Sequence, residues 1–426
     1  MPQHPAYHIH HIHLDRQSPL PAPASERQSG SYLVYWWKDL ALGHLFLKPG
    51  EVLADDAYLA RFTAAIQPAV EQYNKASDPA QDQSWKLLLQ RREFGLWTEW
   101  LANHLASILP ETIPASVPVS AIICTRNRAD QLKTCLQNLL GLRCVPQEIL
   151  VVDNAPADET TLHVVNQFAQ VTYIRELRPG LDIARNTGLL HAQNEIVAYV
   201  DDDVRVHPLW AYGVWHTFQD SAVAAMTGLV IAAQLQTKAQ VNFEKYWSFN
   251  RGYAGKTYTS EFMRATMEIG PPVWEIGAGA NMAFRKSVFR EVGLFNELLD
   301  VGAAGCNGDS EMWHRILSAG FTIKYNPRAI VFHEHRRETK GLKRQLYYYM
   351  RGFTVAALLQ QERHKQAGYR QHLLQVLPKF YIGLIRKGFP RYTSRTSTIW
   401  AEMKGMLSGF IFYKRHQRQL FNPTRS

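Results

Sequence analysis

The sequence predicts an α/β fold with a mostly parallel, Rossmann-like central sheet, an N-terminal helical accessory region and a basic helical C-terminal tail. In the middle of the chain, apolar runs alternate with segments of helical periodicity, and such a βαβ succession implies a parallel sheet with helices on both faces. Each run ends in polar residues, and ligands of such sheets lie beyond the carboxyl ends of the strands. The runs occupy residues 119–124, 148–152, 171–175 and 196–200.

The pattern divides the chain into four regions. Residues 1–30 are rich in His, Pro, Ser and Gln without periodicity, so we expect a disordered N-terminus. Residues 31–115 begin with an apolar run and continue with helical spacing, which predicts a mainly helical accessory domain. Residues 116–335 hold the strand–helix alternation, and residues 336–426 form the basic tail. The five histidines of the first region are expected to be mobile and without a metal role: His4, His8, His10, His11 and His13.

Composition excludes several classes of protein. The 426 residues are 46% apolar and 12% aromatic, which is typical of a globular chain with more than one domain. No run of 18 apolar residues predicts a spanning helix, and the first residues lack a basic segment followed by an apolar one. We therefore expect a cytoplasmic protein. Its cysteines form no CxxC pair and are expected to be reduced: Cys124, Cys135, Cys144 and Cys306.

The positive charge belongs to the tail. Residues 336–426 contain 19 Lys+Arg and 3 Asp+Glu, a net +16, so the rest of the chain carries −6 of the total +10. This argues against a catalytic body that grips nucleic acid and favours a tail that meets an anionic surface. Short apolar stretches bordered by Lys and Arg suit helices in a membrane interface. Helices packed on the body with a solvated basic face fit the same pattern, and both interpretations stay open.

Three consecutive aspartates, Asp201, Asp202 and Asp203, directly follow the apolar run 196–200. Like charges at a strand end repel one another unless a cation or a solvated turn relieves them. One interpretation is a solvated acidic turn. The other is a site where carboxylates hold Mg²⁺ or Mn²⁺ and the metal holds a diphosphate.

Other strand ends favour the second interpretation. The first run ends in Thr125-Arg126-Asn127-Arg128 and the second in Asp153-Asn154. Arginines and backbone amides at a helix start can meet a phosphate, and Asp153 can accept hydrogen bonds from a base N–H. A glycine-bounded turn, residues 178–188, then leads into a helix that carries Arg185.

Six ordered motifs resemble those of the inverting family 2 glycosyltransferases, which have the nucleotide-diphospho-sugar transferase (GT-A) fold. They are IICTRNR, ILVVDNAP, RPGLDIARNTGL, VAYVDDDV, GAGANMAFR and GDSEMWHRILSAG, between Val119 and His335. The resemblance implies a nucleotide-sugar donor and Mn²⁺ or Mg²⁺. It implies metal ligation by Asp203 with Asp201 and His333, and it leaves Asp202 in the variable middle position of the DxD signature. The residues placed around the donor are Thr125, Arg126, Asn127, Arg128, Asp153, Asn154, Gly180, Arg185, Asn186, Asp201, Asp202, Gly279 and Asn281.

The last motif carries the general base of the family, which the resemblance places at Asp309. Gly308 stands where the family usually has a further acid, so the tuning of Asp309 is an open question, and Glu311 is the second candidate. Arg185 is expected along the diphosphate. Asp202 is expected to matter least of the three aspartates, and His335 is expected to be exposed.

The sequence thus predicts a metal-dependent, inverting hexosyltransferase that acts on a saccharide or lipid-linked acceptor in polysaccharide or glycolipid synthesis. The donor is expected to be a UDP-sugar, and peripheral contact with the inner face of the cell membrane is expected to accompany the lipid-linked acceptor. The alternatives are a nucleotidyltransferase, which would need a lysine-bearing glycine loop after the first strand, and a non-catalytic binding or scaffold protein. Nucleic-acid binding rests on the tail alone and is not expected.

Overall fold

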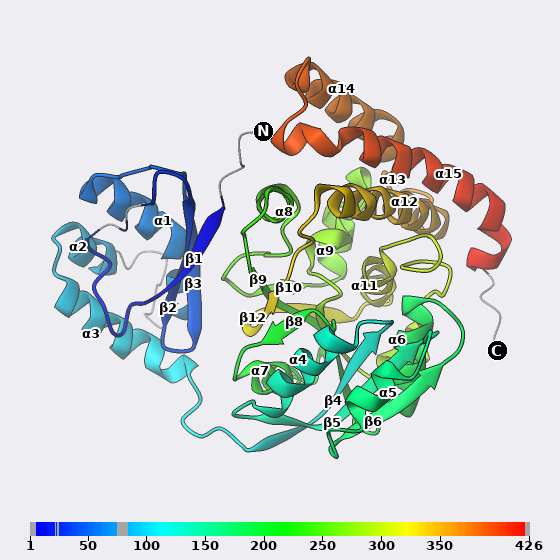
Figure 1. Cartoon of the computed structure of the whole chain (residues 1–426), viewed down its shortest axis with the longest axis horizontal. Helices are drawn as coiled ribbons and strands as arrows, with labels where there is room; N and C mark the ends of the chain where they lie inside the picture. The colour runs from blue at the N-terminus through cyan, green and yellow to red at the C-terminus, as the bar shows by residue number, and fades with distance from the viewer. Residues whose placement is uncertain (1–5, 22, 24, 75–83, 422–426) are drawn as a thin grey trace.

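The computed structural model describes residues 6–21, 23, 25–74 and 84–421 (Figure 1). Two sheets and the helices around them make up these residues. The strands are β1 (Tyr7–His13), β2 (Gly30–Trp37), β3 (Leu40–Leu47), β4 (Ser116–Thr125), β5 (Val145–Asn154), β6 (Val171–Glu176), β7 (Ile196–Val200), β8 (Val204–Val206), β9 (Val223–Ala232), β10 (Lys256–Tyr258), β11 (Asn281–Arg285) and β12 (Thr322–His333). The helices are α1 (Asp55–Tyr73), α2 (Ser84–Gln90), α3 (Phe94–Leu105), α4 (Ala129–Leu140), α5 (Thr160–Val165), α6 (Leu181–His191), α7 (Trp210–Thr217), α8 (Lys238–Trp247), α9 (Ser260–Ala265), α10 (Val288–Val292), α11 (Gly308–Ser318), α12 (Thr339–Arg363), α13 (Tyr369–Gln371), α14 (Leu377–Gly388) and α15 (Ile399–Phe421).

The central sheet has nine strands in the order β10-β12-β9-β11-β7-β4-β5-β6, with β8 paired to β12. Strands β4, β5, β6 and β7 run parallel. Strand β11 is antiparallel to both β7 and β9, so β9 has the direction of β7, and β12 is parallel to β9. Strands β8, β10 and β11 run the other way. The predicted α/β class with a mostly parallel sheet is confirmed, as are helices towards both ends of the chain.

The N-terminal region differs from the prediction, because it contains a three-stranded sheet, β1-β2-β3. The expected disorder of residues 1–30 is wrong for Tyr7–His13, which pairs in parallel with β2. Strand β2 is buried along its whole length, so it shows no alternation that would mark it as a strand. The partner of β1 begins at Gly30, after a segment without periodicity, so the short run Tyr7–His13 carries no local signal of a strand. His4 lies outside the described residues.

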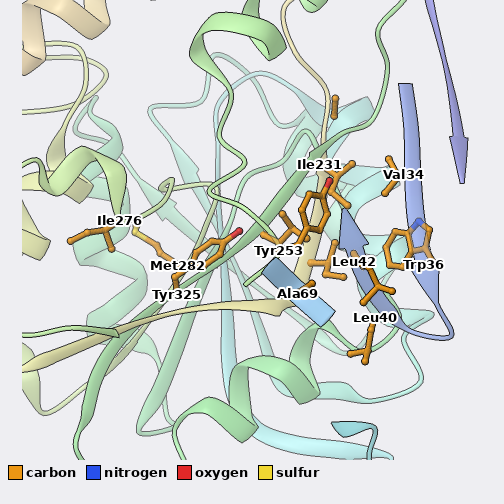
Figure 2. Close-up of a cluster of buried hydrophobic side chains, with 14 of the residues drawn as sticks. Val34, Trp36, Leu40, Leu42, Ala69, Ile231, Tyr253, Ile276, Met282 and Tyr325 are labelled. Atoms are coloured by element: carbon orange, nitrogen blue, oxygen red, sulfur yellow. The ribbon is translucent and has the colours of Figure 1, made fainter. Parts of the chain in front are cut away.

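The N-terminal sheet shares one hydrophobic core with the central sheet. Figure 2 shows Val34 and Trp36 of β2 and Leu42 of β3 on the same side as Ile231 of β9 and Tyr253. All five belong to one cluster of buried residues. The N-terminal sheet therefore packs directly against β9 of the central sheet.

The C-terminal helices also pack on the body. Leu342 and Leu346 of α12 are buried against Ala239 and Phe243 of α8, and α15 lies along α12 (Figure 1). The packed-helix interpretation of the tail therefore holds for α12. Among the residues that the structure describes, no helix combines the length and apolarity needed to cross a bilayer.

Helix α11 begins against α6 with no room for a side chain at its first residue. A Cβ at Gly308 would lie 2.0 Å from Asp182 Oδ2 and 2.6 Å from its Oδ1. Asp182 is 1% exposed, and Arg185 donates to its Oδ1 at 2.9 Å. The glycine therefore makes room for a buried carboxylate beside the candidate base, Asp309.

Replacing Gly308 with alanine is expected to lower the free energy of unfolding by about 1–3 kcal/mol, the usual cost of added volume in a packed interior. Because Asp182→Ala removes the clash, the double variant should be less destabilised than the sum of the single variants. Urea unfolding of the four proteins measures this coupling. Additive single effects would show that Asp182 does not set the requirement for glycine.

Candidate active site

The sheet topology brings polar residues from distant parts of the chain to one edge. The parallel strands β4, β5 and β7 end at Thr125, Asn154 and Val200, so the segments that follow meet there. Strand β11 runs antiparallel to β7 with Asn281 opposite Val200, which brings the loop before β11 to the same edge. Strand β8 pairs with β12 so that Val204 lies opposite His333. This register places Asp203 beside His333.

Three of these side chains can hold a metal ion. Asp201, Asp203 and His333 each offer one ligand atom, and these atoms lie within 4.8 Å of one another. Asp203 Oδ1 lies 3.5 Å from His333 Nε2 and, although buried, has no hydrogen-bond partner among the described residues. Two carboxylates with an imidazole are a donor set that suits Mn²⁺ and is compatible with Mg²⁺. The residues present therefore fit the predicted ion.

The electrostatics of this group separate its members. Burial and the neighbouring Asp203 raise the pKa of Asp201 to about 7. Burial also disfavours the charge of Asp203, but His333 and Arg128 outweigh it and lower the pKa of Asp203 below its ordinary value. Burial lowers the pKa of His333 to about 4, so its imidazole is neutral near pH 7. Asp203 is thus the ionised carboxylate, and His333 has a free lone pair.

Asp202 is more deeply engaged than expected. It is 4% exposed and accepts hydrogen bonds from Thr125 Oγ1 at 2.7 Å and Arg128 Nη1 at 2.5 Å. Arg128 also donates to Asp203 Oδ2 at 2.8 Å. Asp202 therefore joins the end of β4 to the acidic triplet, and the expectation that it matters least of the three aspartates stays a prediction.

Arg185 lies inside a carboxylate cluster. Its Nη1 donates to Asp182 Oδ1 at 2.9 Å and to Asp300 Oδ2 at 2.7 Å. Two buried carboxylates thus already contact the guanidinium, and its expected position along a diphosphate stays a prediction. Asp300 was missed by the sequence motifs, since it stands in the loop before α11 and outside any recognised block.

Asp309 lies next to this cluster. Gly279 N donates to Asp309 Oδ2 at 2.8 Å, and a Cβ at Gly279 would lie 2.8 Å from Arg185 Nη2 and 3.0 Å from Asp309 Oδ2. The loop before β11 thus contacts both residues with bare backbone. Burial and the charge of Asp300 raise the pKa of Asp309 despite the opposing Arg185. A raised pKa makes a carboxylate a stronger base.

Glu311 is not placed to accept a proton. Its side chain is fully buried and forms ion pairs with Arg315 at 3.0 Å and with Arg363 of α12. Although burial disfavours its charge, the two arginines lower the pKa of Glu311. Glu311 therefore joins α11 to α12, and the second candidate for the base is not supported.

Three predicted donor-site asparagines form hydrogen bonds with other segments of the chain. Asn154 joins Arg178 O and Gly180 N at 2.8 and 2.9 Å. Asn186 joins both backbone groups of Phe295 at 3.0 and 2.9 Å. Asn281 donates to Leu229 O and Ala329 O at 3.1 and 2.8 Å and accepts from Trp210 Nε1 at 3.0 Å. Their amides thus join separate segments of the chain, and their contact with a donor stays a prediction.

The strand ends retain groups that can meet a nucleotide. Asp153 is buried and accepts from Tyr173 at 2.9 Å through Oδ2, while its Oδ1 has no partner among the described residues. Arg126 is exposed, and Asn127 Oδ1 accepts from Ala157 N at 3.0 Å. His335, expected to be exposed, is 3% exposed and contacts His333. An exposed arginine and an unpartnered carboxylate oxygen thus remain near the end of β5.

Known proteins resemble the part of the chain that carries the three consecutive aspartates. The family model described as Glycosyl transferase family 2 matches residues 120–293. A pre-mycofactocin glycosyltransferase of Mycobacterium tuberculosis is 25% identical over 241 residues, 56% of this chain and 47% of that protein. Glycosyltransferase AglE of Haloferax volcanii is 27% identical over 235 residues, 53% of this chain and 70% of that protein. The chain thus spans about half the length of the mycobacterial protein.

A solved structure, the mannosyltransferase PcManGT from Pyrobaculum calidifontis in complex with GDP-Man and Mn²⁺, covers 77% of this chain and 98% of its own. Its TM-score is 0.44 and its sequence identity 17%. Residues 120–293 thus match the glycosyltransferase family 2 model, and the relatives that this chain resembles are named glycosyltransferases.

Proposed function

We propose that the protein transfers a sugar from a nucleoside-diphospho-sugar to an acceptor hydroxyl, with inversion at the anomeric carbon. One observation supports this most: a partly buried carboxylate with a raised pKa, Asp309, contacts the loop before β11 at the sheet edge that carries Asp201, Asp203 and His333. A base and a metal-diphosphate site are the two parts that a single displacement needs. The family's nucleotide-sugar chemistry agrees with both.

Each side chain has a separate part in the proposed reaction. Asp309 accepts the proton of the attacking hydroxyl, and the Gly279 N–H orients its carboxylate. Asp201, Asp203 and His333 hold the divalent ion, which when bound offsets the charge of the departing nucleoside diphosphate. Asp153 Oδ1 accepts from a base N–H, which is consistent with uracil, so we propose a UDP-sugar as donor. Arg185 fixes Asp182 and Asp300 around the base.

A non-catalytic binding protein is the second candidate, favoured only by Gly308 in the place of the usual acid. Because Asp182 fills the space beside Gly308, the site keeps a buried carboxylate near Asp309. An assay for Mn²⁺-dependent release of sugar from UDP-sugars separates the enzyme from the binding protein. GDP-sugars in the same assay test the choice of nucleotide. Binding of donor without any transfer or hydrolysis would favour the binding protein.

Asp309→Asn is expected to lower kcat by about 10²–10⁴-fold, because the amide keeps the shape of the side chain but cannot take a proton. Donor affinity should change little. Product formation and donor binding are measured in the same preparation. The surface variant Asp220→Asn serves as a control, and unchanged turnover of Asp309→Asn would remove Asp309 from the role of base.

Asp203→Ala is expected to abolish Mn²⁺-dependent donor binding, because it removes the ionised carboxylate of the metal group. Titration calorimetry with UDP-sugar, with and without Mn²⁺, measures the effect. Asp220→Ala is the control for loss of a surface carboxylate. An undiminished Mn²⁺-dependent heat in Asp203→Ala would refute the metal assignment.

We also propose that the protein works at the inner face of the cell membrane, where a lipid-linked acceptor for polysaccharide or glycolipid synthesis would be presented. Support comes from the outer face of α15, where Trp400, Leu407 and Ile411 are 51%, 59% and 55% exposed. Lys404 and Lys414 lie on the same stripe, at the helical spacing of three and four residues.

Acidic groups are missing from this face. Within residues 371–420, all of which the structure describes, Glu402 is the one carboxylate residue, and it is buried against Arg395. Exposed apolar side chains continue on the preceding segment with Phe380, Ile382 and Phe389. An apolar stripe flanked by unpaired basic side chains is the pattern of a helix that docks on an anionic bilayer.

Replacing Trp400, Leu407 and Ile411 with serine is expected to reduce sedimentation with vesicles that contain anionic phosphatidylserine. The control is the serine replacement of Leu177, Leu190 and Ile269, which lie elsewhere and are at least as exposed. Parent binding should weaken in neutral vesicles and at high salt. Equal sedimentation of both triple variants would refute this docking face. Truncation at residue 335 is less suitable, because it would uncover the side of α8 that α12 buries.

A further inference from the structure

A buried chain of polar side chains leads from the metal group to the N-terminal sheet. His333 Nδ1 lies 3.1 Å from His335 Nδ1, and His335 Nε2 lies 2.8 Å from Glu244 Oε2. Glu244 Oε1 accepts from Ser248 Oγ at 3.1 Å and from Tyr32 OH at 3.4 Å. The chain thus begins at a candidate metal ligand on β12, passes through α8 and ends on β2.

When each of the two imidazoles carries one proton, the contacts of these groups allow a single arrangement of protons. A carboxylate can only accept, so the proton of His335 lies on Nε2 and faces Glu244. The Nδ1 of neutral His335 is then an acceptor, and His333 Nδ1 must be the donor in the contact between the two rings. His333, which carries one ring proton when neutral, is left with a bare Nε2. That atom is the one 3.5 Å from Asp203 Oδ1.

The surroundings hold both rings in this orientation. Phe243 packs on His335 with ring centroids 4.6 Å apart, and Phe249 meets His333 edge-on at 5.2 Å. Helix α8, which carries Glu244, begins with a capping box between Thr237 and Gln240. Gln240 Nε2 also donates to His335 O at 3.3 Å. The aromatic contacts on the two rings and the capped start of α8 therefore hold His335 and Glu244 in place relative to each other.

We propose that Glu244, acting through His335, is a positioning residue that selects the His333 tautomer with a bare Nε2 for a divalent metal ion. This rests on the proposed metal role of His333. Without the acceptor at Glu244, His335 can carry its proton on Nδ1, His333 then carries its own on Nε2, and the nitrogen that faces Asp203 can no longer ligate. Tyr32 links this selection to the N-terminal sheet.

The first test measures Mn²⁺ binding without any donor, by the electron paramagnetic resonance signal of the free ion. Glu244→Met removes the acceptor at similar volume and should weaken Mn²⁺ binding about 10–100-fold, the usual effect of losing a partner behind a ligand. Glu244→Gln keeps an oxygen that can accept from His335 and should bind much more like the parent.

Glu402→Met is the matched control, because Glu402 is an equally buried glutamate held by Arg395 and Tyr381 away from the metal group. It should retain parental Mn²⁺ affinity even if it is less stable. Parental affinity in Glu244→Met would overturn the proposal. Absence of Mn²⁺ binding by the parent itself would instead refute the metal site.

A second test determines the tautomers in the parent protein itself. Nitrogen-15 spectra of the histidine-labelled parent protein, without metal, report which ring nitrogen carries the proton. Signals are assigned by their loss in His333→Gln and His335→Gln. The proposal expects the proton on Nδ1 of His333 and on Nε2 of His335, and a His333 proton on Nε2 would overturn it.

Discussion

The compensation of buried carboxylates governs this end of the molecule. Asp182, Asp202 and Asp300 lie buried beside the ends of β7 and α6, and each depends on an arginine, Arg128 or Arg185. Breaking such a pair would leave a charge in a poorly solvated place, which costs several kcal/mol. Both guanidinium groups therefore form ion pairs within the protein. Of the remaining carboxylates, Asp203 shares Arg128 with Asp202, whereas Asp201 forms no ion pair with an arginine of the described residues.

This shortage explains why a cation fits the group. Asp201 has a pKa near 7 and Asp203 an oxygen without a hydrogen-bond partner, while His333 is neutral. Within the described residues, the charge that would satisfy this group is therefore incomplete. A divalent ion supplies it, and a diphosphate then balances the ion. Asp309 is not one of these ligands, because its neighbours are Arg185 and the backbone of Gly279.

The sequence was sufficient for features that depend on local order. Asp201 to Asp203 follow an apolar run, and the end of a parallel strand lies at the ligand edge, so the triplet could be located without knowing its neighbours. Contacts across the fold were not predictable in this way. Asp300 and Glu244 reach the site from a loop and a helix that no motif marks. Asn281 shows the reverse case, since a motif gave its position but not its three structural partners.

The N-terminal sheet and the C-terminal helices both contact helices that carry residues of the site or their partners. Tyr32 of the N-terminal sheet holds Glu244 on α8, whereas Arg363 of α12 pairs with Glu311, two residues after Asp309 on α11. Groups that act on developing charge are effective when their positions are fixed before the substrate binds. Because the flanks share buried contacts with the central domain, neither is a separable appendage. The segments outside the family match thus stabilise the geometry on which the matched segment depends.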